Sequence, residues 1–181
     1  MLTGMNIVPD TKDWTWVLQR PCPECGFEAG VVTRAELATL IRENAEAWEE
    51  FYNGHQSGFG ERPQPDIWSP LEYACHVRDV FRLYEFRLQL MLNEDNPSYP
   101  NWDQDATAVE ENYGQQDPQQ VIIDLRLAAQ TLAASFAKVT GDQWERTGTR
   151  GDGALFTVES FGRYLVHDPI HHLYDVTKSA I

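Results

Sequence analysis

The sequence of 181 residues has no stretch of about 18 consecutive apolar residues, which is the length a membrane-spanning helix needs. Its first residues, MLTGMNIVPDTKDW, have neither a basic start nor an apolar stretch, so they do not resemble a signal peptide. The length fits one ordinary domain. We therefore expect a cytoplasmic domain with no membrane partner.

Basic residues are scarce. The chain has 14 Lys and Arg against 28 Asp and Glu, which gives a formal charge of −14. Affinity for nucleic acids comes largely from cations that replace the counterions of phosphates, and anionic lipid repels an acidic surface in the same way. The composition thus argues against nucleic acid and anionic membranes as partners. We expect a small-molecule substrate, on the grounds of the histidines and the family resemblance described below.

Cysteine is also rare: the three residues are an odd number and too few for a disulfide framework. Cys22 and Cys25 form the motif CPEC, for which a redox pair and half of a zinc knuckle are two functional interpretations. A cysteine-type zinc site needs two more ligands, and the sequence holds no second CxxC. No strand–helix pattern of the thioredoxin kind surrounds the motif. A structural or incidental role is therefore favoured, and the role of the two cysteines stays open.

Helix starts are well marked. Thr33 with Glu36, and Ser69 with Glu72, have the spacing of capping boxes, and Asp117 can cap a third helix. Apolar residues spaced by three and four follow each start and follow Thr157. The pattern predicts long helices over 33–54 and 69–93 and from 117 and about 157, a short helix near 106–112, and a hairpin around 151–153. A kink or a lost backbone hydrogen bond is expected at Pro169. We predict an all-α four-helix bundle over 33–181, preceded by an irregular, non-helical arm over 1–32.

Histidines are the strongest candidates for chemistry. His167 and His171 are spaced i, i+4, so a helix places both imidazoles on one face. His76 lies in the second predicted helix, which can face the fourth across the bundle. Three imidazoles suit zinc, nickel, iron or copper, and three protein ligands leave coordination positions open for water or substrate. The alternative is that these histidines are core or surface residues without a metal.

Neighbouring residues are given other roles. His172 points about 100° away from His171, which indicates a supporting or surface position. Asp168 is interpreted as a solvent carboxylate and His55 as a solvated loop residue. Glu72 could be a fourth ligand, but its capping-box position explains it fully. Cys75 is expected to pack. No GxGxxG, P-loop or GxSxG motif occurs, so common nucleotide sites and serine hydrolases are not indicated.

Two motifs resemble a known family. The segment Trp68-Ser69-Pro70-Leu71-Glu72-Tyr73-Ala74-Cys75-His76 is similar to the W-S-x-x-E-x-x-x-H signature of the DinB/YfiT-like superfamily of metal-binding four-helix bundles, and His167-Asp168-Pro169-Ile170-His171-His172 is similar to its HxxxH. The resemblance covers about residues 33–178 and leaves the arm outside. It implies that His76, His167 and His171 bind a divalent metal, usually zinc or nickel.

The resemblance also implies functions, since some relatives are transferases or isomerases that use a low-molecular-weight thiol such as mycothiol or bacillithiol. The leading hypothesis is a metal-dependent transferase that adds such a thiol to a small electrophile, with the metal favouring the thiolate. Arg78, Arg82 and Arg163 are candidate partners for a substrate carboxylate. The alternatives are a metal-dependent hydrolase and a non-catalytic metal-binding or stress-response protein, which could be a homodimer through an exposed helix face.

Overall fold

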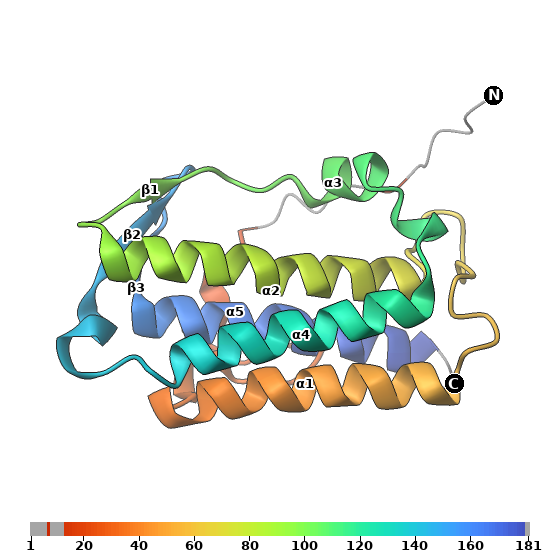
Figure 1. Cartoon of the computed structure of the whole chain (residues 1–181), viewed down its shortest axis with the longest axis horizontal. Helices are drawn as coiled ribbons and strands as arrows, with labels where there is room; N and C mark the ends of the chain where they lie inside the picture. The colour runs from red at the N-terminus through yellow and green to blue at the C-terminus, as the bar shows by residue number, and fades with distance from the viewer. Residues whose placement is uncertain (1–6, 8–12, 180–181) are drawn as a thin grey trace.

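The structure, a computed structural model, describes residue 7 and residues 13–179. The remaining N-terminal residues, on which the signal-peptide expectation depends, and residues 180–181 lie outside the described residues. Four long helices run side by side as a bundle (Figure 1): α1 (Arg34–Gly54), α2 (Pro70–Asn93), α4 (Pro118–Phe136) and α5 (Val158–Ser179). A short helix, α3 (Gln104–Glu110), precedes α4. The predicted all-α four-helix bundle is confirmed.

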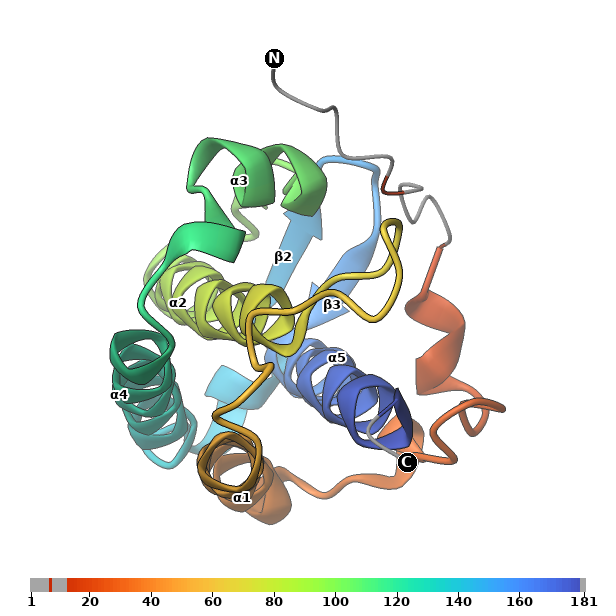
Figure 2. The ribbon, with the colours of Figure 1, turned by 90° about the vertical axis from the view of Figure 1, so that its right-hand side faces the viewer.

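The helices are arranged as a ring in which α1 is next to α4, α4 next to α2, α2 next to α5, and α5 next to α1 (Figure 2). Helices that follow one another in the sequence, α1 and α2, therefore lie diagonally across the bundle. Each helix contributes fully buried side chains to one continuous core, among them Trp48, Phe81, Leu125 and Leu165. Because α2 and α5 are neighbours, residues of one can meet residues of the other.

The long helices begin where the sequence predicts. The Ser69 amide donates to Glu72 Oε2 over 2.8 Å, and the Glu72 amide donates to Ser69 Oγ over 3.3 Å. Asp117 Oδ1 accepts from the Gln119 amide at the start of α4. Pro169 cannot donate its own backbone hydrogen bond, yet α5 continues through it to Ser179. Local capping therefore determines where the helices start, and one missing hydrogen bond does not end α5.

A small sheet lies at one end of the bundle. The strands β2 (Thr147–Arg150) and β3 (Leu155–Thr157) form the predicted antiparallel hairpin, in which Gly153 has a φ of +89° that favours glycine. A two-residue strand, β1 (Ser98–Tyr99), pairs with β2 in parallel. The sequence did not indicate β1, because two residues carry no recognisable alternation.

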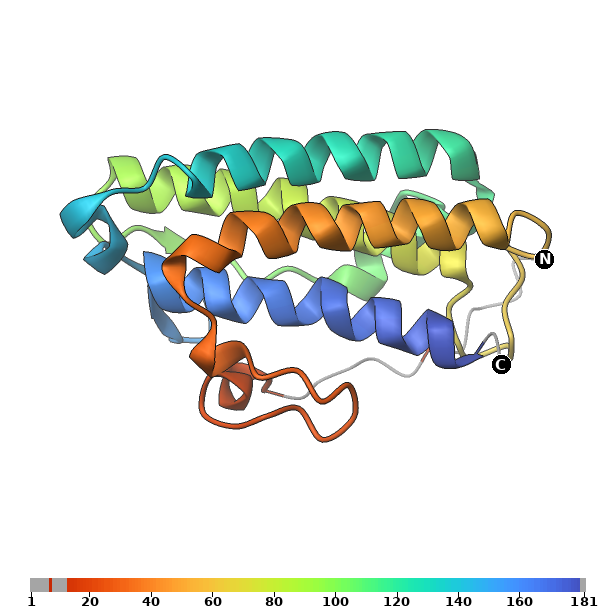
Figure 3. The same cartoon turned by 90° about the horizontal axis from the view of Figure 1, so that it is seen from below.

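The described part of the N-terminal arm contains two single-turn 3₁₀ helices, η1 (Thr15–Leu18) and η2 (Ala29–Val31), and no α-helix. Both pack against α5, and the arm runs alongside that helix (Figure 3). A Cβ on Gly30 would clash with the Leu18 carbonyl, so the arm is closely folded on itself. No helix within residues 13–179 is long and apolar enough to cross a membrane.

Candidate metal centres

Four potential metal ligands lie within six consecutive residues of α5. His167 and His171 are four residues apart, and so are Asp168 and His172. Successive helical residues are rotated by about 100°, so the two pairs face different neighbours. The first pair faces the N-terminal arm and the second faces α2. Among the described residues the structure thus forms two groups of candidate ligands on adjacent faces of one helix.

The first group consists of His76, Asp168 and His172, which we call the α2–α5 triad. His76 Nε2 lies 3.3 Å from Asp168 Oδ1, and His172 Nε2 lies 3.7 Å from the same oxygen. Metal bonds of about 2.1 Å place two ligand atoms roughly 3.0–3.4 Å apart, so the spacing of the triad is close to that of a metal site. Burial opposes ionisation of Asp168, but His172 and His76 outweigh it and hold the pKa of its carboxyl below the usual range.

Aromatic rings fix His76 in place. Trp102 stacks on its imidazole with ring centroids 5.2 Å apart and planes 5° apart, and Trp68 contacts it at a tilt. The imidazole is completely buried, and within the described residues its Nδ1 has no hydrogen-bond partner. A buried polar atom without a partner costs about 1–3 kcal/mol. Among the described residues, the one polar contact of the buried imidazole is therefore made by Nε2, which lies 3.3 Å from Asp168 Oδ1 and points into the triad.

Asp175 lies next to both groups. Its Oδ2 is 3.5 Å from His172 Nδ1 and 3.6 Å from His171 Nε2. His172 contacts its group through Nε2 and His171 contacts its group through Nδ1. The Asp175 carboxylate lies beside the other nitrogen of each ring. Metal-binding histidines commonly have a carboxylate in this position, where it fixes the tautomer and the ring orientation.

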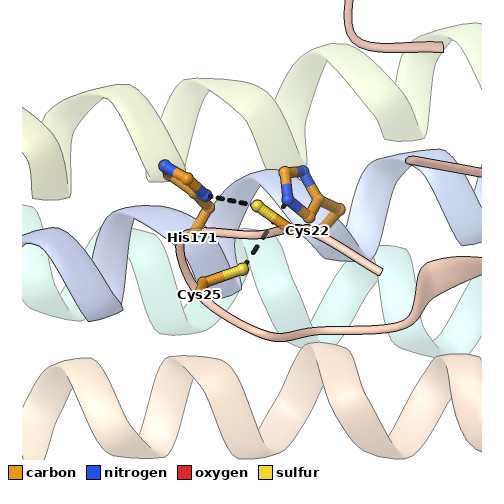
Figure 4. A group of neighbouring side chains, drawn as sticks. Cys22, Cys25 and His171 are labelled. Carbon is orange, nitrogen blue, oxygen red and sulfur yellow. Dashed lines mark hydrogen bonds between the residues drawn. The ribbon is translucent and has the colours of Figure 1, made fainter. Parts of the chain in front are cut away.

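The second group, which we call the arm cluster, consists of Cys22, Cys25, His167 and His171. Figure 4 shows Cys22, Cys25 and His171 of this cluster. Cys22 Sγ lies 3.5 Å from His171 Nδ1, and Cys25 Sγ lies 3.7 Å from His167 Nε2. Both cysteines are free thiols. Burial raises the pKa of the Cys25 thiol to about 11. Burial, and then the neighbouring His171, lowers the pKa of His167 to about 4, so its imidazole is neutral at pH 7.

A cavity of about 350 Å³ adjoins both groups. Its lining includes Asp168 and His172 of the triad, His167 and His171 of the arm cluster, and Tyr73 and Tyr164. Four further carboxylates line it (Glu24, Asp66, Asp105 and Asp175), and among the described residues no lysine or arginine does. The cavity is therefore strongly acidic.

A second cavity of about 350 Å³ lies beside the first. The two share the lining residues Ile67, Trp68, Tyr73 and Asp175. Phe51, Phe59 and Val176 give the second cavity an apolar wall. Tyr73 stands at the junction, and burial raises the pKa of its hydroxyl to about 12, so that it remains a hydrogen-bond donor at neutral pH.

The structure divides the histidines that the sequence grouped together. His167 and His171 lie together as expected, but their nearest candidate ligands are the two cysteines of the arm. His76 meets Asp168 and His172. Asp168 and His172 are therefore not merely solvent-facing residues. The metal ligand set of His76, His167 and His171 stays a prediction.

The residues given non-ligand roles occupy structural positions. Glu72 is buried and forms an ion pair with Arg62. Cys75 is buried and packs near the Tyr113 carbonyl, as expected. His55 is exposed, and its Nδ1 lies 2.8 Å from the Phe51 carbonyl oxygen. None of these three side chains belongs to either group.

The arginines considered as substrate partners are engaged elsewhere, and none of them lines either cavity. Arg78 pairs with Asp79. Arg82 pairs with Asp79 and Asp124. Arg163 pairs with Glu159 and donates to the Val32 carbonyl. The structure thus gives no support for these arginines as carboxylate partners.

Two sequence signals could have indicated this arrangement. The segment HDPIHH contains DxxxH in addition to HxxxH, one residue out of phase. A CxxC paired with HxxxH also matches the ligand spacing of Cys₂His₂ zinc sites, so a second CxxC was not required. Both signals depend on contacts between distant segments, which the folded chain reveals.

Comparisons with known proteins agree with the fold and the motifs. A family model of the DinB superfamily matches residues 55–176. A solved structure of YfiT from Bacillus subtilis superposes with a TM-score of 0.73 at 19% sequence identity, over 81% of this chain and 85% of that one. YfiT is described as a probable metal-dependent hydrolase with an unusual four-helix bundle topology. A comparison with curated proteins gave no match.

Proposed function

This chain belongs to the DinB superfamily, and from that premise we propose that it is a metal-dependent enzyme whose reaction takes place at the α2–α5 triad. The observation that carries the proposal is the convergence of His76 Nε2, Asp168 Oδ1 and His172 Nε2 beside an acidic cavity. Three protein ligands leave positions open for a reactant, which is typical of catalytic rather than structural sites.

The donor types suit the ions expected from the sequence. Two imidazoles and one carboxylate bind zinc or nickel, and Asp175 supports the outer nitrogen of His172 over 3.5 Å. Trp102 holds the His76 ring in its orientation. The protein would therefore present the metal on a rigid platform formed by α2 and α5.

We infer that the reaction is transfer of a low-molecular-weight thiol to a small electrophile. When bound at the triad, the metal would supply the positive charge that keeps the thiol in its nucleophilic thiolate form at neutral pH. The first cavity would hold the thiol beside Asp168 and His172, and the apolar second cavity would hold the electrophile. Two adjoining cavities of about 350 Å³ each support a reaction that needs two reactants.

Tyr73 supports this arrangement because it lines both cavities. With a pKa of about 12, its hydroxyl keeps its proton at neutral pH and can donate a hydrogen bond to negative charge that develops on the electrophile. The Tyr73 ring also contacts the His172 imidazole, with ring centroids 5.1 Å apart, so Tyr73 lies next to a residue of the triad.

The charge of the first cavity favours one thiol over the other. Apart from the four candidate ligands in its lining, the charged side chains of this cavity are all carboxylates, and no lysine or arginine of the described residues is among them. A thiol with carboxylate groups, such as bacillithiol, would be repelled. A neutral, hydroxyl-rich thiol such as mycothiol would be accepted, with Gln104 and the carboxylates as hydrogen-bond partners.

Hydrolysis is a second candidate, and the acidic lining favours it. Asp66, Asp105 and Glu24 line the cavity that adjoins the triad. A carboxylate near a metal-activated water can act as general base. YfiT, which has a similar fold, carries the description of a probable metal-dependent hydrolase.

The test is a rate measurement on untagged, metal-loaded protein. Mycothiol and bacillithiol are each offered with a chromogenic electrophile, and the same protein is given ester and amide substrates without thiol. Thiol-dependent product formation, lost in His76→Ala and retained in Tyr52→Phe, whose side chain lines neither cavity, supports transfer. Thiol-independent hydrolysis lost in the same variant supports the hydrolase. If wild type and His76→Ala turn over nothing, or turn over every substrate equally, both proposals are wrong and a non-catalytic binding role is favoured.

A further inference from the structure

We propose that Cys22, Cys25, His167 and His171 form a second, closed zinc site that fastens the N-terminal arm to α5. This site lies outside the α2–α5 triad and shares no ligand with it. The two cysteines also lie outside residues 55–176, the part of the chain that matches the family model.

The distances between donor atoms fit tetrahedral zinc. Zinc bonds of about 2.3 Å to sulfur and about 2.0 Å to nitrogen, at tetrahedral angles, place the two atoms roughly 3.6 Å apart. The two sulfur–nitrogen distances in the arm cluster are 3.5 Å and 3.7 Å. All four donor atoms lie within 4.8 Å of one another. Two independent thiol–imidazole hydrogen bonds would not require the two pairs to meet around one centre.

The backbone of the CPEC segment turns both thiols toward α5. The Gly26 amide donates to the Cys22 carbonyl over 2.8 Å, and the Cys22 amide donates to the Phe27 carbonyl over 3.0 Å. Gly26 closes this turn with a φ of +73°, which favours glycine. The two sulfur atoms are drawn on the side of the turn that faces His171 (Figure 4). The turn therefore places both potential ligands on the face of the arm that meets α5.

The surroundings of His171 match those of a metal ligand. Its Nδ1 faces Cys22, while its Nε2 lies 3.6 Å from both Glu24 Oε2 and Asp175 Oδ2. A carboxylate that accepts from the outer nitrogen leaves the lone pair of the inner nitrogen for the metal. Trp14 covers both imidazoles, with ring centroids 5.6 Å from His167 and 5.4 Å from His171.

Four protein donors leave no position for substrate, so this zinc would be structural. Two thiolates also balance the charge of one Zn²⁺ in a position where three of the four ligands are buried. A zinc ion at the arm cluster would also affect the first cavity, which adjoins it. The arm supplies Trp14 and Glu24 to its lining, and the zinc would hold both against α5. Metal at the arm cluster would therefore shape the cavity that serves the triad.

The first test compares metal content and cobalt spectra of reduced, untagged, full-length variants. Cys22→Ser/Cys25→Ser is expected to lose one zinc per chain and the thiolate-to-cobalt charge-transfer absorption of the Co²⁺-loaded protein. Cys75→Ala, which removes the buried cysteine of α2, is the matched control and keeps both. His76→Ala leaves the thiolate signal intact, which separates this site from the triad and from the proposed activity.

A second measurement uses the wild-type protein alone, so that a poorly folded variant does not decide the matter. X-ray absorption at the zinc edge is expected to give two sulfur neighbours at about 2.3 Å. Alkylation should modify Cys22 and Cys25 only after a chelator is added. The proposal is overturned if zinc has only nitrogen and oxygen neighbours, if the two cysteines react equally with and without chelator, or if they form a disulfide while the zinc content is unchanged.

Discussion

His171 and His172 are adjacent in the sequence, yet their imidazoles belong to different groups. The ring planes are 88° apart, with centroids separated by 6.1 Å. His171 Nδ1 faces Cys22 of the arm, whereas His172 Nε2 faces Asp168 of the α2–α5 triad. Because neighbouring helical residues are rotated by about 100°, one stretch of α5 contributes side chains to two candidate metal sites.

Asp175 is expected to support both sites, because one of its oxygen atoms lies 3.5 Å from His172 Nδ1 and 3.6 Å from His171 Nε2. Asp175→Asn should lower metal affinity at each site by about 10–100-fold. Titration with a competing chelator measures both affinities. Lys178→Met is the control, since it removes the ion pair between Lys178 and Asp175 without removing the carboxylate. Equal affinities in wild type and Asp175→Asn would show that the carboxylate has no such role.

Tyr73 offers a test of the reaction rather than of metal binding. If its hydroxyl donates to the developing charge, Tyr73→Phe should reduce kcat by about 100-fold while leaving the metal content unchanged. Steady-state kinetics with the substrate pair found for the wild type would measure the loss. Tyr52→Phe, on a half-buried tyrosine of α1 that lines neither cavity, is the control. An unchanged kcat in Tyr73→Phe would remove the hydroxyl from the mechanism.

Acid should weaken the ion pair between Glu72 and Arg62. Burial alone would raise the pKa of the Glu72 carboxyl, but hydrogen bonds from Arg62 and from the Ser69 amide hold it below its ordinary value of 4.5. A lowered pKa in the folded state means that the stabilisation is present above about pH 4.5 and is lost as the pH falls through the folded-state value.

Glu72→Gln should therefore lower the free energy of unfolding by about 3 kcal/mol at pH 7. The difference from wild type should shrink below pH 4.5. Urea denaturation at a series of pH values measures this, and Arg62→Met should show the same narrowing. A difference that stays constant from pH 7 to pH 3.5 would contradict the assignment.

Close packing of α5 predicts opposite effects at two glycines. A Cβ on Gly162 would lie 2.6 Å from Leu37 Cδ1 and 3.0 Å from Phe136 Cε1, whereas one on Gly54, at the end of α1, would meet nothing within 4 Å. Gly162→Ala should destabilise the protein by about 1–3 kcal/mol. Gly54→Ala should stabilise it by up to about 1 kcal/mol. Thermal unfolding measures the melting temperatures of the two variants. An equal change in melting temperature for both would argue against this packing.

The helices could be predicted because their signals are local. Ser69 and Glu72 are three residues apart, and their capping box forms as the spacing predicts. The candidate sites could be predicted only in part, because they depend on contacts between distant segments. Cys22 and His171 are 149 positions apart, and no periodicity relates them.

The direction of a side chain on a helix does not predict its role unless the neighbouring elements are known. The sequence correctly separates His172 from His171 by about 100°, and this angle alone indicates only a supporting or surface position for His172. In the folded chain the same direction points at His76 of α2. The identity of the neighbouring helix, rather than the geometry of α5 itself, was the missing information.

The central claim is that α5 serves two metal sites, and anomalous diffraction from zinc-loaded crystals tests it most directly. The account predicts two peaks at the zinc edge, one surrounded by Cys22, Cys25, His167 and His171 and the other by His76, Asp168 and His172. A single peak bound jointly by His76, His167 and His171, with the cysteines uninvolved, would contradict it.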